Sequence, residues 1–303
     1  MARRTLNGVS APRATRKSEL FRGALSRRIL RRLDASLKTQ WKRYRKKLRR
    51  CQKSFSEDAV HDTRVEARRL VSLLELLSPF MNLRRARKVE RLLKGHLDVF
   101  DDLRDTQVLV LAVGKMLRAF PSASAFYAHL LERERALTRS TRKNVKEVRT
   151  QRLGKLVRAC RAEVESRRQK TAPEAVQRLL AAAVHRAFTR TEQLRRRIDP
   201  RYTKTIHRTR IAFKRFRYMM ETLAEYLPGT NDKLLDRMHQ YQTMMGDIQD
   251  AEVLLQALQK FLRKQKIEPV PMRPFLKALI RRRHDLIRIY LIAAAELTEF
   301  WPG

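Results

Sequence analysis

Apolar residues recur every three or four positions along most of the chain, which is the spacing that places them on one face of an α-helix. Interruptions of this spacing coincide with Pro, Gly, Ser and Asn, which favour turns and helix ends. The pattern therefore predicts an all-α chain with eight helices, over residues 18–50, 56–78, 82–118, 122–168, 173–197, 199–228, 230–266 and 271–300. We expect a bend near Gly95, and we expect Asp199 and Pro200 to cap and open the sixth helix.

Composition narrows the class of protein further. The 303 residues include only 8 Gly and 10 Pro, too few turn residues for a β-sandwich or barrel. The glycines are also too widely spaced for a glycine-rich phosphate-binding loop. No apolar run is long enough to predict a membrane-spanning helix. The 2 cysteines, Cys51 and Cys160, are far apart and form no zinc motif, which indicates a reducing, cytoplasmic setting.

Two segments of the chain are repeated. Residues 60–70 match residues 206–216 at an offset of 146. In both segments a His is followed by an Arg three residues later and by two basic residues seven and eight residues after the His. Residues 102–109 match residues 247–254 at an offset of 145, with Asp at the first and fourth positions. This repetition predicts a tandem duplication. We expect two four-helix halves, residues 18–168 and 173–301, related by pseudo-twofold symmetry.

The first repeated segment places its cations on one helical face in both halves. On a helical wheel, Arg64 and Arg68 fall within about 60° of His61, and a row of leucines lies opposite. His207, Arg210 and Lys214 form the same row in the second half. Such a row holds cations about 5 Å apart, which suits a chain of phosphates, because Arg grips oxygens bidentately and Lys acts as a point charge. One row alone would indicate a solvated face, but its repetition favours binding.

The net charge indicates a polyanionic partner. Lys and Arg number 70 against 31 Asp and Glu, a net charge of +39, which favours nucleic acid, an anionic membrane or a phosphate polymer. Further basic stripes follow the first, third and fourth predicted helices; their members include Arg31, Lys38, Lys42, Arg45, Arg91, Lys94 and Arg142. Residues 1–17 are basic without any acid and are interpreted as a disordered tail, with an organelle transit peptide as the alternative.

Two acidic features admit more than one interpretation. The pairs Asp102/Asp105 and Asp247/Asp250 could serve as acid–base groups or metal ligands, but in so basic a chain we expect them to clamp cations of a neighbouring helix. The dipeptides His61-Asp62 and His284-Asp285 are typical of a class of metal-dependent phosphohydrolases. Because Arg208 stands where Asp62 would be repeated, the dipeptide is not part of the duplicated pattern, and we expect no metal site.

The repeated motifs resemble those of the CHAD (conserved histidine α-helical domain) family. The resemblance covers residues 18–301 and implies two helical halves around a basic central cavity that binds inorganic polyphosphate, with an association with polyphosphate granules. It implicates the basic residues of both repeats, His61, Arg64, Arg68, Arg69, His207, Arg210, Lys214, Arg215 and Arg217. Some family members also carry a triphosphate-tunnel catalytic domain, for which the 17 residues before the first helix leave no room.

We therefore expect a non-catalytic polyphosphate-binding module without cofactor. The alternative is a basic helical protein that binds nucleic acid, and the basic run at residues 42–50 favours it. If the protein binds polyphosphate, nucleic acid is expected to compete only weakly.

The two halves depart from each other at two positions. Val71 stands opposite Arg217, which predicts unequal cavity walls, and Asp101 stands opposite Gly246, where the second half allows a close helix approach.

Overall fold

The computed structural model describes residues 26–227, 229–265 and 270–301, and every regular element in them is helical, which confirms the all-α class. The α-helices of the described residues are α1 (Ser26–Lys53), α2 (Glu57–Leu76), α3 (Leu83–Asp98), α4 (Asp101–Met116), α5 (Ser124–Glu147), α6 (Gln151–Lys170), α7 (Pro173–Arg196), α8 (Thr203–Leu223), α9 (Asp232–Gln265) and α10 (Arg273–Ala293). The predicted tail, residues 1–17, and the start of the first predicted helix lie outside the described residues.

Local capping explains where several helices begin. The side chain of Ser56 accepts a hydrogen bond from the backbone N–H of Ala59 at the start of α2, and Asn82 caps α3 in the same way, both as predicted. The predicted cap at Asp199 is wrong, because α8 begins at Thr203. The Asp199 carboxylate instead accepts the backbone N–H of Arg201 in a local turn.

The third predicted helix is two helices. The break between α3 and α4 falls at Val99 and Phe100, and Gly95, where we expected a bend, lies inside α3. Phe100 is 1% exposed and belongs to the hydrophobic core. No Gly or Pro marks this break in the sequence. It follows from the burial of a large aromatic side chain, which is a tertiary effect.

The fourth predicted helix also divides, into α5 and α6. Val148 takes an extended backbone conformation after α5, so the carbonyl groups at this end lose their helical partners. The side-chain amide of Gln52, on α1, donates to the carbonyl oxygens of Val145 and Val148, at 3.0 Å in both cases. A residue nearly a hundred positions away therefore stabilises the break.

Replacing Gln52 with Ala is expected to lower the free energy of unfolding by about 1–2 kcal/mol, because two carbonyl groups at the end of α5 lose their donor. Urea unfolding followed by circular dichroism measures the change. Lys53→Ala, at the neighbouring exposed position, is the matched control and should change the midpoint little. Equal midpoints for the two variants would show that Gln52 does not hold the break.

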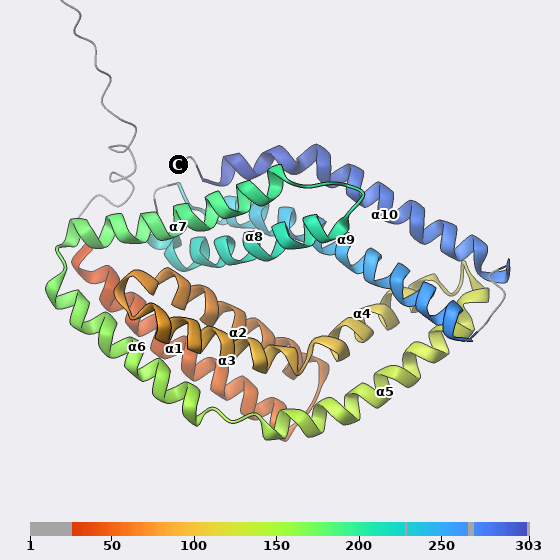
Figure 1. The fold of residues 1–303 in the computed structure, drawn as a ribbon, viewed down its shortest axis with the longest axis horizontal. Coiled ribbons are helices and arrows are strands. Elements are labelled where there is room, and N and C mark those ends of the chain that lie inside the picture. Colours follow the sequence, from red (N-terminus) through yellow and green to blue (C-terminus); the bar gives the residue numbers. More distant parts are fainter. Residues whose placement is uncertain (1–25, 228, 266–269, 302–303) are drawn as a thin grey trace, which may run out of the picture.

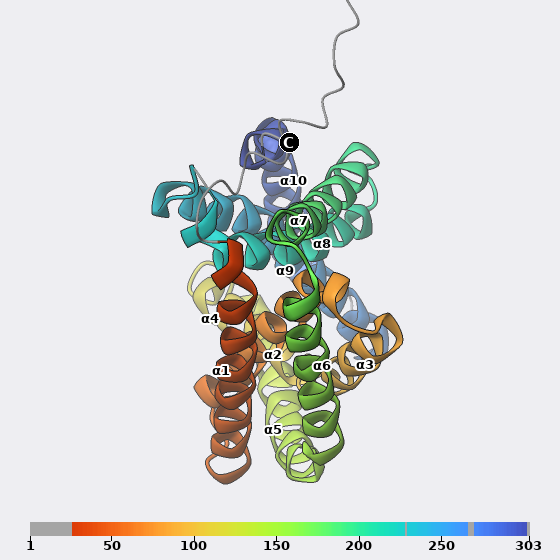
Figure 2. The same cartoon turned by 90° about the vertical axis from the view of Figure 1, so that its left-hand side faces the viewer.

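Two hydrophobic cores lie at opposite ends of the molecule. The first is built from α1, α2, α3, α6, α7 and α8, with the adjoining ends of α9 and α10. The second joins α4 and α5 to the far ends of α9 and α10. In Figure 2, α1 and α6 run side by side below α7. Each core contains helices from both predicted halves; the pseudo-twofold relation of these halves stays a prediction.

The region between the two cores is bounded by five helices. Figure 1 shows α2 and α3 on one side of the centre and α8 and α9 on the other, with α4 leading from the first core toward the second. α2 packs against α8 at one side, and α4 packs against α9 at the other. The helices that carry the repeated motifs therefore surround one space. None of the described helices is both long and apolar enough to cross a bilayer.

Candidate functional site

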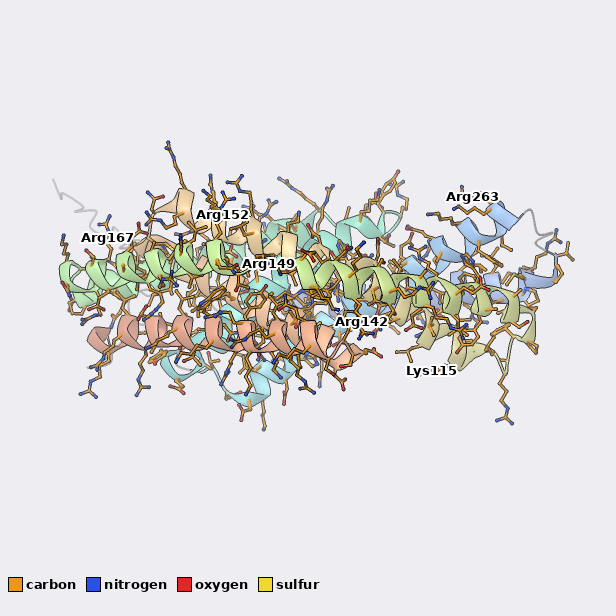
Figure 3. The ribbon with its side chains drawn as sticks, turned by 90° about the horizontal axis from the view of Figure 1, so that it is seen from below. Lys115, Arg142, Arg149, Arg152, Arg167 and Arg263 are labelled. Atoms are coloured by element: carbon orange, nitrogen blue, oxygen red, sulfur yellow. The ribbon has the colours of Figure 1, made fainter. Side chains whose placement is uncertain are left out.

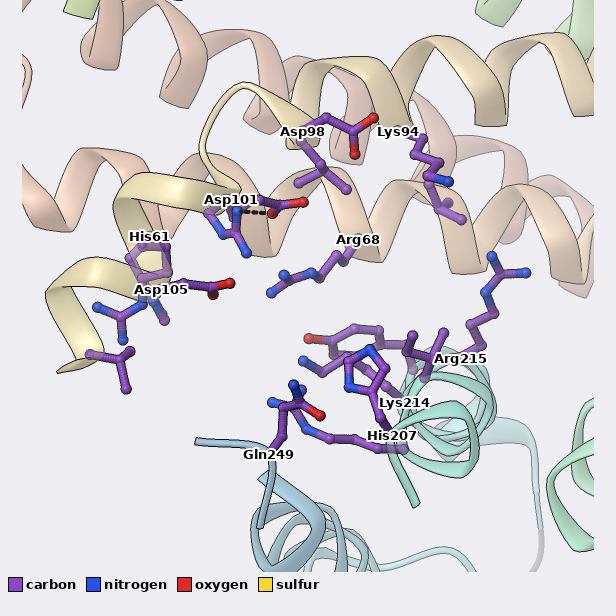
Figure 4. A pocket seen from close by; sticks show the side chains of 18 of the residues that line it. His61, Arg68, Lys94, Asp98, Asp101, Asp105, His207, Lys214, Arg215 and Gln249 are labelled. Carbon is purple, nitrogen blue, oxygen red and sulfur yellow. Dashed lines mark hydrogen bonds and ion pairs between the residues drawn. The ribbon is translucent and has the colours of Figure 1, made fainter. Parts of the chain in front are cut away.

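A cavity of about 880 Å³ lies at the centre of the molecule, lined by side chains from α2, α3, α4, α8 and α9. Its lining is rich in cations and includes five carboxylates. The Lys and Arg side chains that line it are Arg64, Arg68, Arg91, Lys94, Arg104, Arg210, Lys214 and Arg215. Figure 4 shows four of them: Arg68 and Lys94 lie on one side of the cavity, and Lys214 and Arg215 lie on the other. The lining is therefore suited to an anion larger than a single phosphate.

The two repeated helices present their cations to the cavity because their opposite faces are buried. On α2, Leu70 and Leu73 are at most 3% exposed and belong to the first core. On α8, Phe213 and Phe216 are fully buried in the same core. Fixing these apolar faces leaves the His–Arg–basic face of each helix turned to the cavity. The structure thus brings the two basic faces to one cavity.

Arg64 and Arg210 occupy equivalent positions in the two repeats but have different surroundings. Arg64 is buried and forms an ion pair of 2.5 Å with Asp101. The position equivalent to Asp101 is Gly246, and a Cβ atom built on Gly246 would lie 3.5 Å from the guanidinium of Arg210. Gly246 thus lets Arg210 rest against α9 without a carboxylate. Arg64 is paired with Asp101, whereas Arg210 forms no ion pair within 4 Å with the described residues and acts on Asp247 and Asp250 over a longer distance.

Arg68 and Lys214 are the most perturbed cations of the cavity. Burial lowers the pKa of Arg68 to about 10, with a further contribution from Arg64. Burial also lowers the pKa of Lys214 to about 6, and the nearby Arg68 and Arg210 add to the effect. Neither side chain has an ion pair within 4 Å with an acid of the described residues. In Figure 4 they approach each other from α2 and α8. A bound anion would relieve this repulsion.

The two repeated histidines differ in their environment. His61 is exposed at the margin of the cavity, whereas His207 is half-buried. Burial lowers the pKa of His207, Arg210 lowers it further, and Gln249 beside it partly offsets the effect. Within the described structure, Nδ1 of His207 and Nε of Arg210 are buried without a hydrogen-bond partner. His207 is therefore neutral at pH 7 in the free protein and keeps a ring nitrogen available to a ligand.

The predicted acidic clamp is not formed by direct ion pairs. Asp102, Asp105, Asp247 and Asp250 form no ion pair within 4 Å with the described residues, whereas Asp101 pairs with Arg64. Arg64 nevertheless acts on Asp105, and Arg210 acts on Asp247 and Asp250, in each case against the rise in pKa that burial causes. Burial raises the pKa of Asp105, and Asp101 raises it further. Burial likewise raises the pKa of Asp250. Among the described residues, no group of three or more His, Cys, Asp or Glu side chains could hold a metal ion.

Nine of the predicted binding residues line the cavity. They are His61, Arg64, Arg68, Arg91, Lys94, His207, Arg210, Lys214 and Arg215. Arg69 does not, because it follows Arg68 by one residue and so points about 100° away, where it is exposed 3.9 Å from Glu66. Arg217 is buried away from the cavity, where it binds Glu221 at 2.5 Å and Gln242 at 3.0 Å.

The remaining predicted residues belong to outer surfaces. Arg31, Lys38, Lys42 and Arg45 lie on the exposed face of α1, since the opposite face of this helix packs into the first core. Arg142 is exposed on α5, as Figure 3 shows together with Arg149 and Arg152. None of these five side chains lines the central cavity. Their stripes are solvated helix faces.

Sequence reasoning overlooked Arg104 and Gln249. Both line the cavity, on α4 and α9. They occupy equivalent positions in the second repeated segment, where the offset of 145 residues pairs them. Their duplicated position was the signal that could have identified them.

Tyr218 also lines the cavity. Its ring packs against the guanidinium of Arg217, and the Cζ atom of Arg217 lies 4.9 Å from the ring centre.

Comparisons with known proteins agree with this architecture. The family model for the CHAD domain matches residues 35–259. The crystal structure of the CHAD domain from the plant Ricinus communis is similar at a TM-score of 0.61, with 17% sequence identity, over 93% of this chain and 89% of that one. The structure of PptA from Streptomyces chartreusis is similar at a TM-score of 0.55, with 19% identity, over 89% of this chain and 98% of that one. A search of curated proteins finds no match. The family match covers most of the chain, and the chain therefore belongs to the CHAD domain family.

Proposed function

We propose that this protein binds inorganic polyphosphate in its central cavity and does not catalyse a reaction. The observation that carries the proposal is the group formed by Arg68, Arg210 and Lys214, three basic side chains from two facing helices that form no ion pair within 4 Å with an acid of the described residues. Crowding like charges in a half-buried site is unfavourable unless an anion compensates them. CHAD domains are associated with polyphosphate binding, which is consistent with this charge arrangement.

A polymer of phosphates fits this site better than a single phosphate. The cations are spread over α2, α3, α4 and α8 rather than gathered at one point. Successive phosphates of one chain can contact all of them, and each contact would be a charge-assisted hydrogen bond. Association with polyphosphate granules is part of this proposal, because the polymer is concentrated there.

The His–Asp dipeptides do not support a phosphohydrolase. Asp62 binds the ammonium group of Lys47 at 2.5 Å, and Asp285 lies 3.7 Å from Arg288. Each carboxylate is thus engaged by a cation of the same surface. Nucleic acid remains the second candidate, and the observation in its favour is the set of exposed basic side chains on α1 and α5 outside the cavity. These faces could follow a nucleic-acid backbone without base recognition.

Titration of the purified protein with long-chain polyphosphate, and with single-stranded RNA at equal phosphate concentration, tests the proposal. We expect polyphosphate to bind at least about tenfold more tightly at near-physiological salt, and we expect its affinity to fall steeply as salt rises, since binding releases counterions. Free phosphate is assayed in the same samples with and without Mg²⁺ and Mn²⁺. Equal affinity for RNA would favour the nucleic-acid interpretation, and metal-dependent phosphate release would show an enzyme.

A further inference from the structure

A second cavity, of about 540 Å³, adjoins the first between α2, α3, α7 and α8. Four residues line both cavities: Val71, Glu90, Ile211 and Arg215. The side chains of these four residues therefore lie between the two cavities. Like the first cavity, the second combines aliphatic side chains with cations.

Arg215 forms the boundary between the two cavities. Its guanidinium lies 2.9 Å from a carboxylate oxygen of Glu90 and 3.5 Å from one of Glu75, so it links α8 to both α3 and α2. Figure 4 shows Arg215 at the margin of the first cavity, apart from Arg68 and Lys214. The ion pairs of Arg215 connect side chains only.

The second cavity carries excess positive charge beyond this boundary. Arg87, Arg186, Arg190 and Arg208 line it, and none of them forms an ion pair within 4 Å with an acid of the described residues. Its two carboxylates, Glu75 and Glu90, are both engaged by Arg215. The four arginines are therefore available to an anion that arrives from the first cavity.

We infer that the second cavity is a further binding compartment for polyphosphate, which a long chain enters from the first cavity past Arg215. Phosphate oxygens would replace the carboxylates of Glu75 and Glu90 on the Arg215 guanidinium, which binds both kinds of anion in the same bidentate way. A chain that is bound in the first cavity and too short to pass Arg215 gains no contact with these arginines. The inference rests on the proposed function and adds to it a preference for long chains with a structural origin.

The triple variant Arg186→Ala, Arg190→Ala, Arg208→Ala tests the inference with tripolyphosphate and long-chain polyphosphate as probes. We expect its affinity for the long chain to fall by about tenfold. The three arginines are exposed, so each contact contributes less than one made in the half-buried first cavity. Its affinity for tripolyphosphate should stay unchanged. The matched control is Arg133→Ala, Arg135→Ala, Arg139→Ala on α5, which removes the same charge from exposed positions outside all three described cavities. Circular dichroism checks that both variants keep their helix content.

Glu75→Gln provides an independent test. Glu75 lines the second cavity but not the first, and its replacement removes a negative charge that competes for Arg215. The variant should bind the long chain several-fold more tightly and tripolyphosphate as before. The inference is overturned if the triple variant loses no more long-chain affinity than the α5 control. A wild-type protein that binds neither probe would instead refute the proposed function itself.

Discussion

Replacing Arg68, Arg210 and Lys214 together with Ala is expected to weaken polyphosphate binding by about a thousandfold. Each side chain lines the central cavity, forms no ion pair within 4 Å with an acid of the described residues, and can donate as a cation to a bound polyanion. A hydrogen bond to a charged group contributes about 1.5–3 kcal/mol, and about 1.4 kcal/mol corresponds to a factor of ten in affinity. Three such contacts account for the expected loss even at the lower limit. Fluorescence titration at fixed salt measures it.

The matched control for this variant is Arg31→Ala, Lys38→Ala, Lys42→Ala on α1. It removes three basic side chains from an exposed face outside the cavity, and at least as much net charge as the cavity variant. Any loss of affinity in this control therefore reports only the overall electrostatic attraction between the protein and the polyanion. We expect a change of about threefold or less. Similar losses in the two variants would contradict the cavity assignment and favour binding over the whole basic surface. The cavity variant should fold normally, because removing crowded cations relieves repulsion.

Polyphosphate binding is expected to strengthen as pH falls from about 9 toward 6, with uptake of protons. Burial lowers the pKa of Lys214 to about 6, so most of this side chain is neutral at pH 7 in the free protein. A bound polyanion favours the charged form and raises this pKa. Between the free and the bound pKa, binding takes up a proton, and one linked proton changes the affinity by up to about tenfold per pH unit. Below about pH 6 the Lys214 contribution levels off, because both states are then protonated.

Calorimetry in two buffers of different ionisation enthalpy measures this proton uptake directly. Long chains are used because the end groups of polyphosphate also take up protons in this pH range, and a long chain has few end groups for each bound phosphate. Lys214→Arg is the informative control, since Arg stays charged over this whole pH range. This variant should bind at least as tightly as the wild type at pH 8 and take up fewer protons. His207, whose pKa burial also lowers, accounts for the remaining uptake. Equal uptake by Lys214→Arg and wild type would contradict the role assigned to Lys214.

The sequence predicted the central part of the site well because the relevant information is local. His61, Arg64 and Arg68 lie on one face of any helix that contains them, and their repetition at residues 207–214 distinguishes this face from an ordinary solvated one. The leucines and phenylalanines on the opposite face specify which side is buried. The same reasoning predicted the helix starts after Ser56 and Asn82, where the capping side chain lies within three residues of its partner.

Basic stripes without a repeated partner could not be assigned from the sequence. The stripe on α1 and the one on α3 look alike as sequence patterns, yet Arg91 and Lys94 line the cavity and Arg31 and Lys38 face solvent. The difference depends on which helix packs against which, and helical periodicity carries no information about that. Arg217 shows the converse case: its basic run suggested a ligand contact, but Glu221 and Gln242 hold it in the interior.

The sequence by itself determined the all-α class and the two basic helix faces, because each depends on spacing within about 20 residues. It also determined the repetition of the motifs, because this rests on matching residue types and requires no knowledge of packing. Only the tertiary structure decided the breaks at Phe100 and Val148, which depend on core burial and on the distant amide of Gln52. It also decided that Asp101 forms an ion pair with Arg64, while Arg210, which lies against Gly246, forms none within 4 Å with the described residues. Compensation of a charge requires two groups within a few ångströms of each other, and for residues far apart in the chain only helix packing brings them to that distance.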